Sequence, residues 1–160
     1  MLPIPNETDP AKVLENCNFL YSVEYKTRAA LLPAMVSALA KDYPGISESA
    51  VLASVLEREQ IRSTGTPEGV AFPHGKHESI DGICVAIATA RHGIDFGRTT
   101  PMPCRIIVLT LSSLYRADGH LHFLAHMAGF LRFEAVRSAV LAAKNKAALL
   151  DALHQKVRLV

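Results

Sequence analysis

Residues 105–111 limit how this chain can fold more than any other part of the sequence. They spell RIIVLTL, a nearly continuous run of β-branched and leucine side chains, which is typical of a strand buried on both faces. A second strand candidate covers residues 83–89, and the stretch 93–103 between the two is rich in turn-forming residues. Helical segments stand before and after this pair, so the chain is predicted to fold as one α/β domain.

The helical segments are indicated by apolar residues at steps of three and four. Residues 26–42 carry such a stripe, although Pro33 should kink this helix or mark a late start. A second helix is predicted after Ser47 and ends in the charged triplet 57–59. Three more are predicted toward the C-terminus, over residues 117–130, 134–143 and 146–155. Asp118 is a candidate cap for the first of these three.

The composition is that of an ordinary globular domain: 160 residues, 49% apolar and 20% charged. Seventeen basic and fifteen acidic residues leave a net charge of +2, without the clustered basic charge that nucleic acid or an anionic membrane binds. No apolar run approaches the roughly 18–20 residues that cross a bilayer, and the opening MLPIPNE shows no secretion signal. The three cysteines form no Cys-x-x-Cys pair, so we expect a reduced, cytoplasmic location.

His74 is the clearest candidate for a reactive side chain. It follows Pro73 at the end of a short apolar strand candidate, 70–72, in a glycine-rich loop, and Gly75 leaves room around its ring. A neutral imidazole, with an ordinary pKa of about 6.5, is a good nucleophile near neutral pH and can carry a phosphoryl group. The chain offers several hydrogen-bond donors for phosphoryl oxygens: Arg58, Ser63, Thr64 and the amides of the glycine-rich loop. The alternative is a loop histidine exposed without a function.

His120 is the second candidate. It lies near the start of the helix predicted over 117–130, whose apolar face would consist of Leu121, Leu124, Ala125 and Ala128. The positive end of the helix dipole disfavours an imidazolium there, so a neutral ring with a donor nitrogen could support a phosphoryl group on His74. The alternative is an ordinary cap or surface residue.

Other histidines raise the alternative of a metal site. His122 and His126 stand four residues apart, a spacing that can place both on one metal. No third ligand is identifiable, and an exposed polar face is the favoured interpretation. His77 and His74 form another pair, but the lysine between them argues against a metal. We therefore expect neither a metal nor a cofactor.

Three motifs stand in register along the chain. Arg58-Glu59 ends a helix, Ser63-Thr64-Gly65 forms a turn, and GVAFPHG over 69–75 carries His74. The later piece is His120-Leu121, and the intervals are 16 residues from Arg58 to His74 and 46 from His74 to His120. In this order and spacing the chain resembles the enzyme IIA family of the bacterial sugar phosphotransferase system, in its fructose, mannitol and nitrogen-regulatory (type 2) branch. The resemblance runs from about residue 26 to residue 153.

The resemblance implies a role for each of these residues. His74 would accept a phosphoryl group from the phosphocarrier histidine protein and pass it to a IIB component, or use it for nitrogen-type regulation of partner proteins. His120 would be the second active-site histidine and Arg58 the cation beside the phosphoryl group. Thr64, with Ser63 beside it, would bind phosphoryl oxygens. No cofactor is implied, and the sugar specificity is not encoded in such a domain.

The implied fold is a single domain of the α/β (α+β) class, with a mixed β-sheet flanked by helices on both faces. It would cover residues 26–155. Residues 1–25 would be an N-terminal polar lead-in with a short helix near Pro10, for which Asp9 is a candidate cap.

Residues 66–68, Thr-Pro-Glu, depart from the usual pattern of the family. Pro67 removes an amide donor, and Glu68 adds negative charge beside the expected phosphoryl site. This charge would make the phosphoryl group more labile unless Lys76 or Arg62 compensates for it. A function of another class therefore stays open: an interaction module on the same fold that binds a regulatory partner and transfers nothing.

Overall fold

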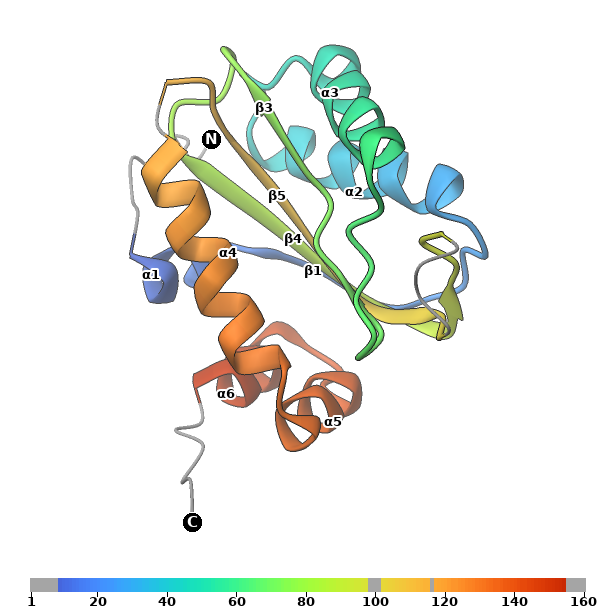
Figure 1. Ribbon diagram of the computed structural model, residues 1–160. Coiled ribbons are helices and arrows are strands. Elements are labelled where there is room, and N and C mark those ends of the chain that lie inside the picture. Colours follow the sequence, from blue (N-terminus) through green and yellow to red (C-terminus); the bar gives the residue numbers. More distant parts are fainter. Residues whose placement is uncertain (1–8, 98–101, 116, 155–160) are drawn as a thin grey trace.

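A mixed, five-stranded β-sheet forms the centre of the molecule (Figure 1). The structure is a computed structural model that describes residues 9–97, 102–115 and 117–154. The strands are β1 (Asn18–Val23), β2 (Val70–Ala71), β3 (His74–His77), β4 (Ile83–Ile94) and β5 (Cys104–Ser113). Their order is β1-β4-β5-β2, and β3 also pairs with β5. Among these strands only β4 and β5 pair antiparallel. Strands β2 and β3 both pair parallel with β5, so they follow one another along the same edge of the sheet.

Helices cover both faces of this sheet. They are α1 (Pro10–Glu15), α2 (Arg28–Asp42), α3 (Glu48–Ile61), α4 (Ala117–Leu131), α5 (Glu134–Ala142) and α6 (Lys146–His154). The side chains of β4 alternate between two hydrophobic clusters: Cys84 and Ala86 pack with α2 and α3, whereas Val85 and Ile87 pack with α1, α4, α5 and α6. The predicted fold class is confirmed, as is a β5 strand buried on both faces. In the described part of the chain, no helix has the length and apolar character needed to span a bilayer.

Helix α2 tolerates the proline that the sequence analysis found troublesome. The helix begins at Arg28, two residues later than predicted, after Thr27 accepts a hydrogen bond from the Ala30 amide at 3.2 Å. Pro33 lies inside α2, which continues to Asp42. The apolar stripe of this helix is buried as predicted, at Leu31, Leu32, Met35, Val36 and Leu39.

Strand β1 was not predicted. Residues 18–23 were expected to be part of a polar lead-in, but they pair parallel with β4 from Asn18 opposite Ala86 onward. The preceding helix α1 is capped by Asp9, whose side chain accepts from the Ala11 amide at 3.1 Å, as the sequence suggested. Val13 and Leu14 of α1 are buried against the sheet. The folded unit therefore includes residues upstream of residue 26.

The buried face of α4 also differs from the prediction. Phe123, Met127 and Leu131 face the core, whereas Leu121 is 63% exposed. Helix α4 begins at Ala117, so Asp118 lies within its first turn and not at the cap position. With Phe123 facing the core, His120 lies one turn earlier on the same buried side, because residues three apart share a helix face.

Candidate functional site

His74 is the first residue of β3. The sequence analysis had instead placed it in a glycine-rich loop. The Thr110 amide of β5 donates to the Pro73 carbonyl at 3.0 Å, and β3 then pairs with β5 from His74 opposite Thr110. Pro73 has no N–H group to donate to a neighbouring strand, and this is tolerated at the edge of a sheet. The Nδ1 atom of His74 lies 2.9 Å from the Phe72 carbonyl oxygen. A carbonyl only accepts, so Nδ1 donates, and the lone pair of this ring is on Nε2.

His120 packs against this ring. The two ring centroids lie 5.0 Å apart with an interplanar angle of 60°. His120 is only 2% exposed, while His74 is partly exposed. The structure thus brings together two histidines that are 46 residues apart in the sequence, and leaves the first of them accessible to solvent.

Both rings are held uncharged at neutral pH. Burial lowers the pKa of His74 below its usual 6.5; the bond to the Phe72 carbonyl opposes this shift, and the positive charge of Arg58 adds to it. Burial lowers the pKa of His120 to about 4, with smaller contributions from His74 and Lys76. A neutral His74 keeps the Nε2 lone pair that a nucleophile requires.

Helix α3 places Arg58 near His74. The Ser54 hydroxyl donates to the Lys76 carbonyl at 3.1 Å and accepts from the Lys76 amide at 3.2 Å, so it joins α3 to β3. Arg58 is one helical turn beyond Ser54, on the same side of the helix, and its charge acts on His74. Its guanidinium donates to the Arg62 carbonyl at 2.9 Å, which leaves further N–H groups for another acceptor. Arg58 and Lys76 together make the surroundings of His74 favourable to an anion.

Thr64 and Ser63 lie in the turn after α3, and their hydroxyl groups already have acceptors. Thr64 Oγ1 donates to Glu59 Oε1, and the Thr64 amide donates to Glu59 Oε2 at 3.3 Å. Ser63 Oγ donates to the Phe96 carbonyl. A direct contact between either hydroxyl and a phosphoryl oxygen therefore requires these bonds to be exchanged.

Glu59 and Arg28 form an ion pair that the sequence analysis missed. The Glu59 side chain is 2% exposed, and its Oε2 lies 3.3 Å from Arg28 Nη1. The same Arg28 nitrogen donates to the Phe96 carbonyl at 2.9 Å. Two carboxylate oxygens, one guanidinium and two hydroxyls thus fix the turn 63–65 beside α3. An available signal was the acidic residue next to Arg58 in a helix, but its partner lies 31 positions upstream.

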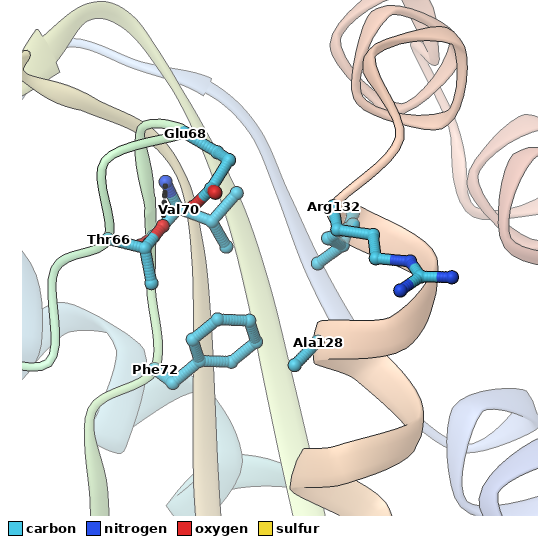
Figure 2. Close-up of a pocket in the computed structure, with 7 residues that line it drawn as sticks. Thr66, Glu68, Val70, Phe72, Ala128 and Arg132 are labelled. Atoms are coloured by element: carbon cyan, nitrogen blue, oxygen red, sulfur yellow. Dashed lines mark hydrogen bonds between the residues drawn. The ribbon is translucent and has the colours of Figure 1, made fainter.

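Glu68 does not play the part expected of it. The charges that act on His74 are those of Arg58, Glu59 and Lys76, so the nearby carboxylate is Glu59, which Arg28 compensates. Glu68 lines a separate pocket of about 220 Å³. Figure 2 shows it on the β2 side of this pocket, with Arg132 on the α4 side.

Two polar side chains that the sequence analysis passed over lie next to the histidine pair. Thr110 and Ser112 of β5 are fully buried, opposite His74 and Lys76 of β3. Their hydroxyl oxygens have no hydrogen-bond partner, and neither does Nδ1 of His120. An unsatisfied buried polar group costs about 1–3 kcal/mol, so three of them beside the candidate site require an explanation.

The other histidines have separate surroundings. His122 is exposed on α4, and His126 packs edge-on against Phe130 with centroids 4.7 Å apart. Nδ1 of His77 accepts from the Ser79 amide at 3.0 Å. Within residues 9–97, 102–115 and 117–154, no three His, Cys, Asp or Glu side chains are grouped closely enough to hold a metal ion.

The chain matches a known protein family along most of its length. Residues 12–156 match the family described as "Phosphoenolpyruvate-dependent sugar phosphotransferase system, EIIA 2". The fructose-specific EIIA component of Haloferax volcanii is 32% identical over 108 residues, which cover 68% of this chain and 70% of that protein. The chain therefore belongs to the type 2 enzyme IIA family of the phosphotransferase system, as its motifs indicated.

Relatives of this chain differ in their described roles. The nitrogen regulatory protein of Bradyrhizobium diazoefficiens is 29% identical over 135 residues, covering 78% of this chain and 88% of that protein. The fructose-specific EIIABC component of Bacillus subtilis is 26% identical over 134 residues, or 84% of this chain. The chain spans only about a fifth of the length of that protein, 21%.

Solved structures share the fold. The nitrogen regulatory protein IIA-Ntr from Neisseria meningitidis superposes with a TM-score of 0.79 at 21% identity, covering 89% of this chain and 97% of that one. Enzyme IIA mannitol from Escherichia coli, in a complex with phosphorylated IIB mannitol, superposes with a TM-score of 0.71 at 19% identity, covering 85% and 93%. The predicted fold of the enzyme IIA mannitol and nitrogen-regulatory type is confirmed.

Proposed function

We propose that this protein is a phosphohistidine carrier that accepts a phosphoryl group on His74 from the phosphocarrier histidine protein and passes it to a IIB component. The observation that carries the proposal is the uncharged His74 ring, fixed through Nδ1 by the Phe72 carbonyl so that Nε2 is free to react. Family membership supports the same reaction class. The complex of a fold neighbour with phosphorylated IIB supports a IIB component as the recipient.

The transfer is a displacement at phosphorus. The Nε2 lone pair of His74 forms the new N–P bond while the N–P bond on the donor histidine breaks, and its electron pair returns to the donor ring. Nδ1 of His74 keeps its proton and its bond to the Phe72 carbonyl throughout. Since phosphorylation at Nε2 increases the positive charge of the ring, a carbonyl acceptor at Nδ1 stabilises the phosphorylated state.

Four side chains would stabilise the transferred group. Arg58 supplies a planar guanidinium that can bind two phosphoryl oxygens. His120, being neutral, offers one N–H as a donor without placing a second positive charge against His74. Most of the catalysis of such a transfer comes from positioning and from electrostatic stabilisation of the phosphoryl oxygens. We assign Thr64 and Ser63 to phosphoryl binding only after their bonds to Glu59 and Phe96 are exchanged.

The test uses phosphoenolpyruvate, enzyme I and the phosphocarrier protein, followed by mass spectrometry of the intact chain. The expected product carries one acid-labile phosphoryl group, which His74→Ala abolishes. His122→Ala is the matched control, because His122 is an exposed histidine on α4, and this variant should acquire the group normally. A phosphoryl group on His74→Ala, or none on the wild type, contradicts the assignment.

A second candidate function is regulation by direct binding, with no transfer. The similarity to a nitrogen regulatory protein over 88% of its length favours it. If a captured partner binds His74→Asp and His74→Ala with the same affinity, phosphorylation is irrelevant to that interaction. Different affinities support a binding function controlled by His74.

We also propose a cytoplasmic location for the protein. The chemistry supports it, because the proposed phosphoryl donor derives from phosphoenolpyruvate. The three cysteines are buried and free, which suits a reducing compartment.

A further inference from the structure

Three polar atoms are buried beside the histidine pair without hydrogen bonds: Thr110 Oγ1, Ser112 Oγ and His120 Nδ1. Among the described residues, they are the only buried side-chain nitrogen or oxygen atoms in this condition. None of the three is bonded to either of the others as the side chains stand, so a bond among them requires a hydroxyl side chain to rotate. A hydroxyl both donates and accepts, and an imidazole nitrogen does one or the other, so the three are chemically complementary.

The sheet register places these atoms in one layer. Thr110 lies opposite His74, and Ser112 lies opposite Lys76. On β5 the neighbouring residues Ile106 and Val108 pack with the α4 cluster, whereas Leu109 and Leu111 pack with the α2 cluster. Since side chains alternate along a strand, Thr110 and Ser112 point to the α4 side. That is the side from which His120 packs against the His74 ring, with centroids 5.0 Å apart.

The state of Nδ1 decides what Nε2 of His120 can do. A neutral imidazole carries one proton, and the hydrogen bond at one nitrogen fixes whether the other donates or accepts. Phosphoryl oxygens only accept, so His120 helps a phosphoryl group on His74 only when its proton is on Nε2. This requires Nδ1 to accept a hydrogen bond inside the protein, and the two hydroxyls of β5 are fully buried donors on that side.

We propose that Thr110 and Ser112 are positioning residues: after rotation of its side chain, one of their hydroxyls donates a hydrogen bond to His120 Nδ1 and so keeps the proton of this ring on Nε2, from which it can be donated to a phosphoryl group. The effect of this hydrogen bond on phosphoryl acceptance rests on the proposed function. The hydrogen bond itself does not. His120 is thereby prepared as a donor before the phosphoryl group arrives.

The experiment measures the tautomer of His120 by nitrogen NMR of the ring, in Thr110→Val, in Ser112→Ala and in the double variant. The wild type is expected to have its proton on Nε2, and the double variant a mixture of tautomers. Its rate of phosphoryl acceptance from the phosphocarrier should fall about fivefold, as for the loss of one hydrogen bond between neutral groups. Thr110→Ser and Ser112→Thr keep a hydroxyl and should retain the wild-type tautomer.

Ser113→Ala is the matched control. Ser113 is buried on the same strand, but it points to the opposite face and accepts from the Tyr115 amide at 3.1 Å. This variant should leave the tautomer of His120 unchanged. If the double variant has the wild-type tautomer and rate, the inference is wrong. If the double variant does not fold, Thr110→Val and Ser112→Ala decide by the same two measurements, and the inference is wrong if both single variants behave as the wild type. Absence of any phosphoryl group on the wild type contradicts the proposed function instead, and the NMR result still decides the role of the hydroxyls.

Discussion

Arg58 and Glu59 are neighbours on α3 and have different tasks. Arg58 is partly exposed and faces His74, whereas Glu59 is buried and receives hydrogen bonds from Arg28 and from both the hydroxyl and the amide of Thr64. Glu59 therefore holds the turn 63–65 against the end of α3, where Arg58 lies. We therefore expect the geometry of the site to depend on Glu59, whose hydrogen-bond partners are Arg28 and Thr64 and not His74.

Glu59→Gln tests this dependence. The amide keeps the size of the side chain but removes the charge opposite Arg28, and one of its polar atoms can no longer accept from Thr64. We expect a loss of about 1–3 kcal/mol in the free energy of unfolding, measured with urea. The exposed Glu57 on the same helix gives the control, because Glu57→Gln should change stability by less than about 0.5 kcal/mol. Equal effects of the two substitutions would contradict a structural role for the ion pair.

His120 makes stability depend on pH. Its pKa is about 4 in the folded protein and near the usual 6.5 in the unfolded chain. Between these values the unfolded state binds more protons, so stability is complete above about pH 6.5 and falls as the pH approaches 4. We expect His120 to account for about 2–3 kcal/mol of the loss between pH 7 and 4. His74 acts in the same direction.

Urea unfolding at both pH values checks this prediction. His120→Gln should reduce the loss of stability on acidification, because the substituted side chain does not titrate. His122→Gln, at an exposed position on the same helix, should leave the loss unchanged. An unaltered pH dependence in His120→Gln would show that His120 is not protonated on unfolding in this range.

At the scale of elements, the contact between α3 and β3 determines where Arg58 stands relative to His74. A Cβ atom at Gly75 would lie 2.8 Å from Val55 Cγ2 and 3.2 Å from the Val55 amide nitrogen. The absence of a side chain at Gly75 therefore lets the helix approach the strand closely. Ser54 fixes this approach through its two hydrogen bonds to Lys76.

Gly75→Ala should push α3 away from β3. The expected cost is about 1–3 kcal/mol of stability, as for an overpacked core, together with slower phosphoryl acceptance because Arg58 moves with the helix. Gly129→Ala is the matched control. Nothing lies within 4 Å of a Cβ at Gly129 in α4, and alanine should stabilise the helix by about 0.5–1 kcal/mol. Unfolding curves and transfer rates of both variants are the measurements; a Gly75→Ala protein as stable as the wild type would rule out the close contact.

The sequence predicted most helices but not which face of α4 is buried. Leu121 and Leu124 and, separately, Phe123 and Met127 each form apolar pairs at helical spacing, so periodicity alone did not choose between the two faces. The structure buries the larger aromatic side chain and exposes Leu121. Strand β1 was missed for a related reason: its residues are only partly buried at the sheet edge, and NFLYSV shows no strict alternation.

For the whole molecule, one hydrophobic cluster against the sheet joins residues of the N-terminal helix α1 to residues of the C-terminal helices. The cluster beneath α4 contains Val13 and Leu14 of α1, which lie beside residues of α4 and α6. Strand β1, also near the N-terminus, pairs parallel with β4. The N-terminal segment is therefore part of the core and not an appendage to it.

A chain that starts at Lys26 tests this integration. It lacks α1 and β1, so β4 loses its neighbour and the α4 cluster loses three buried side chains, Val13, Leu14 and Cys17. We expect the shortened chain to lose its cooperative thermal transition, measured by circular dichroism against the intact chain. A sharp transition at the wild-type temperature would show that residues 26–155 fold independently, as the sequence analysis expected.

Some residues of the candidate site could be predicted from the sequence, and others could not. His74, His120 and Arg58 were predicted from their local sequence and from the spacing of their motifs, and the structure brings them near one another. The Arg28–Glu59 pair and the hydroxyls of Thr110 and Ser112 were not found, because their importance depends on contacts between segments far apart in the chain. Side chains of ordinary type become informative only when burial and partners are known.

His74 begins a strand at the border of the sheet, and β3 has β5 as its neighbour on one side only. The His74 ring at this position can be reached from solvent without any rearrangement of the interior. It is too small for two proteins to contact it at the same time. In the proposed transfer, donor and recipient would therefore bind in turn, and the protein would leave the first before it meets the second. Steady-state kinetics of the complete relay should then give parallel lines in double-reciprocal plots, the sign of a shuttle that is loaded and unloaded in separate encounters.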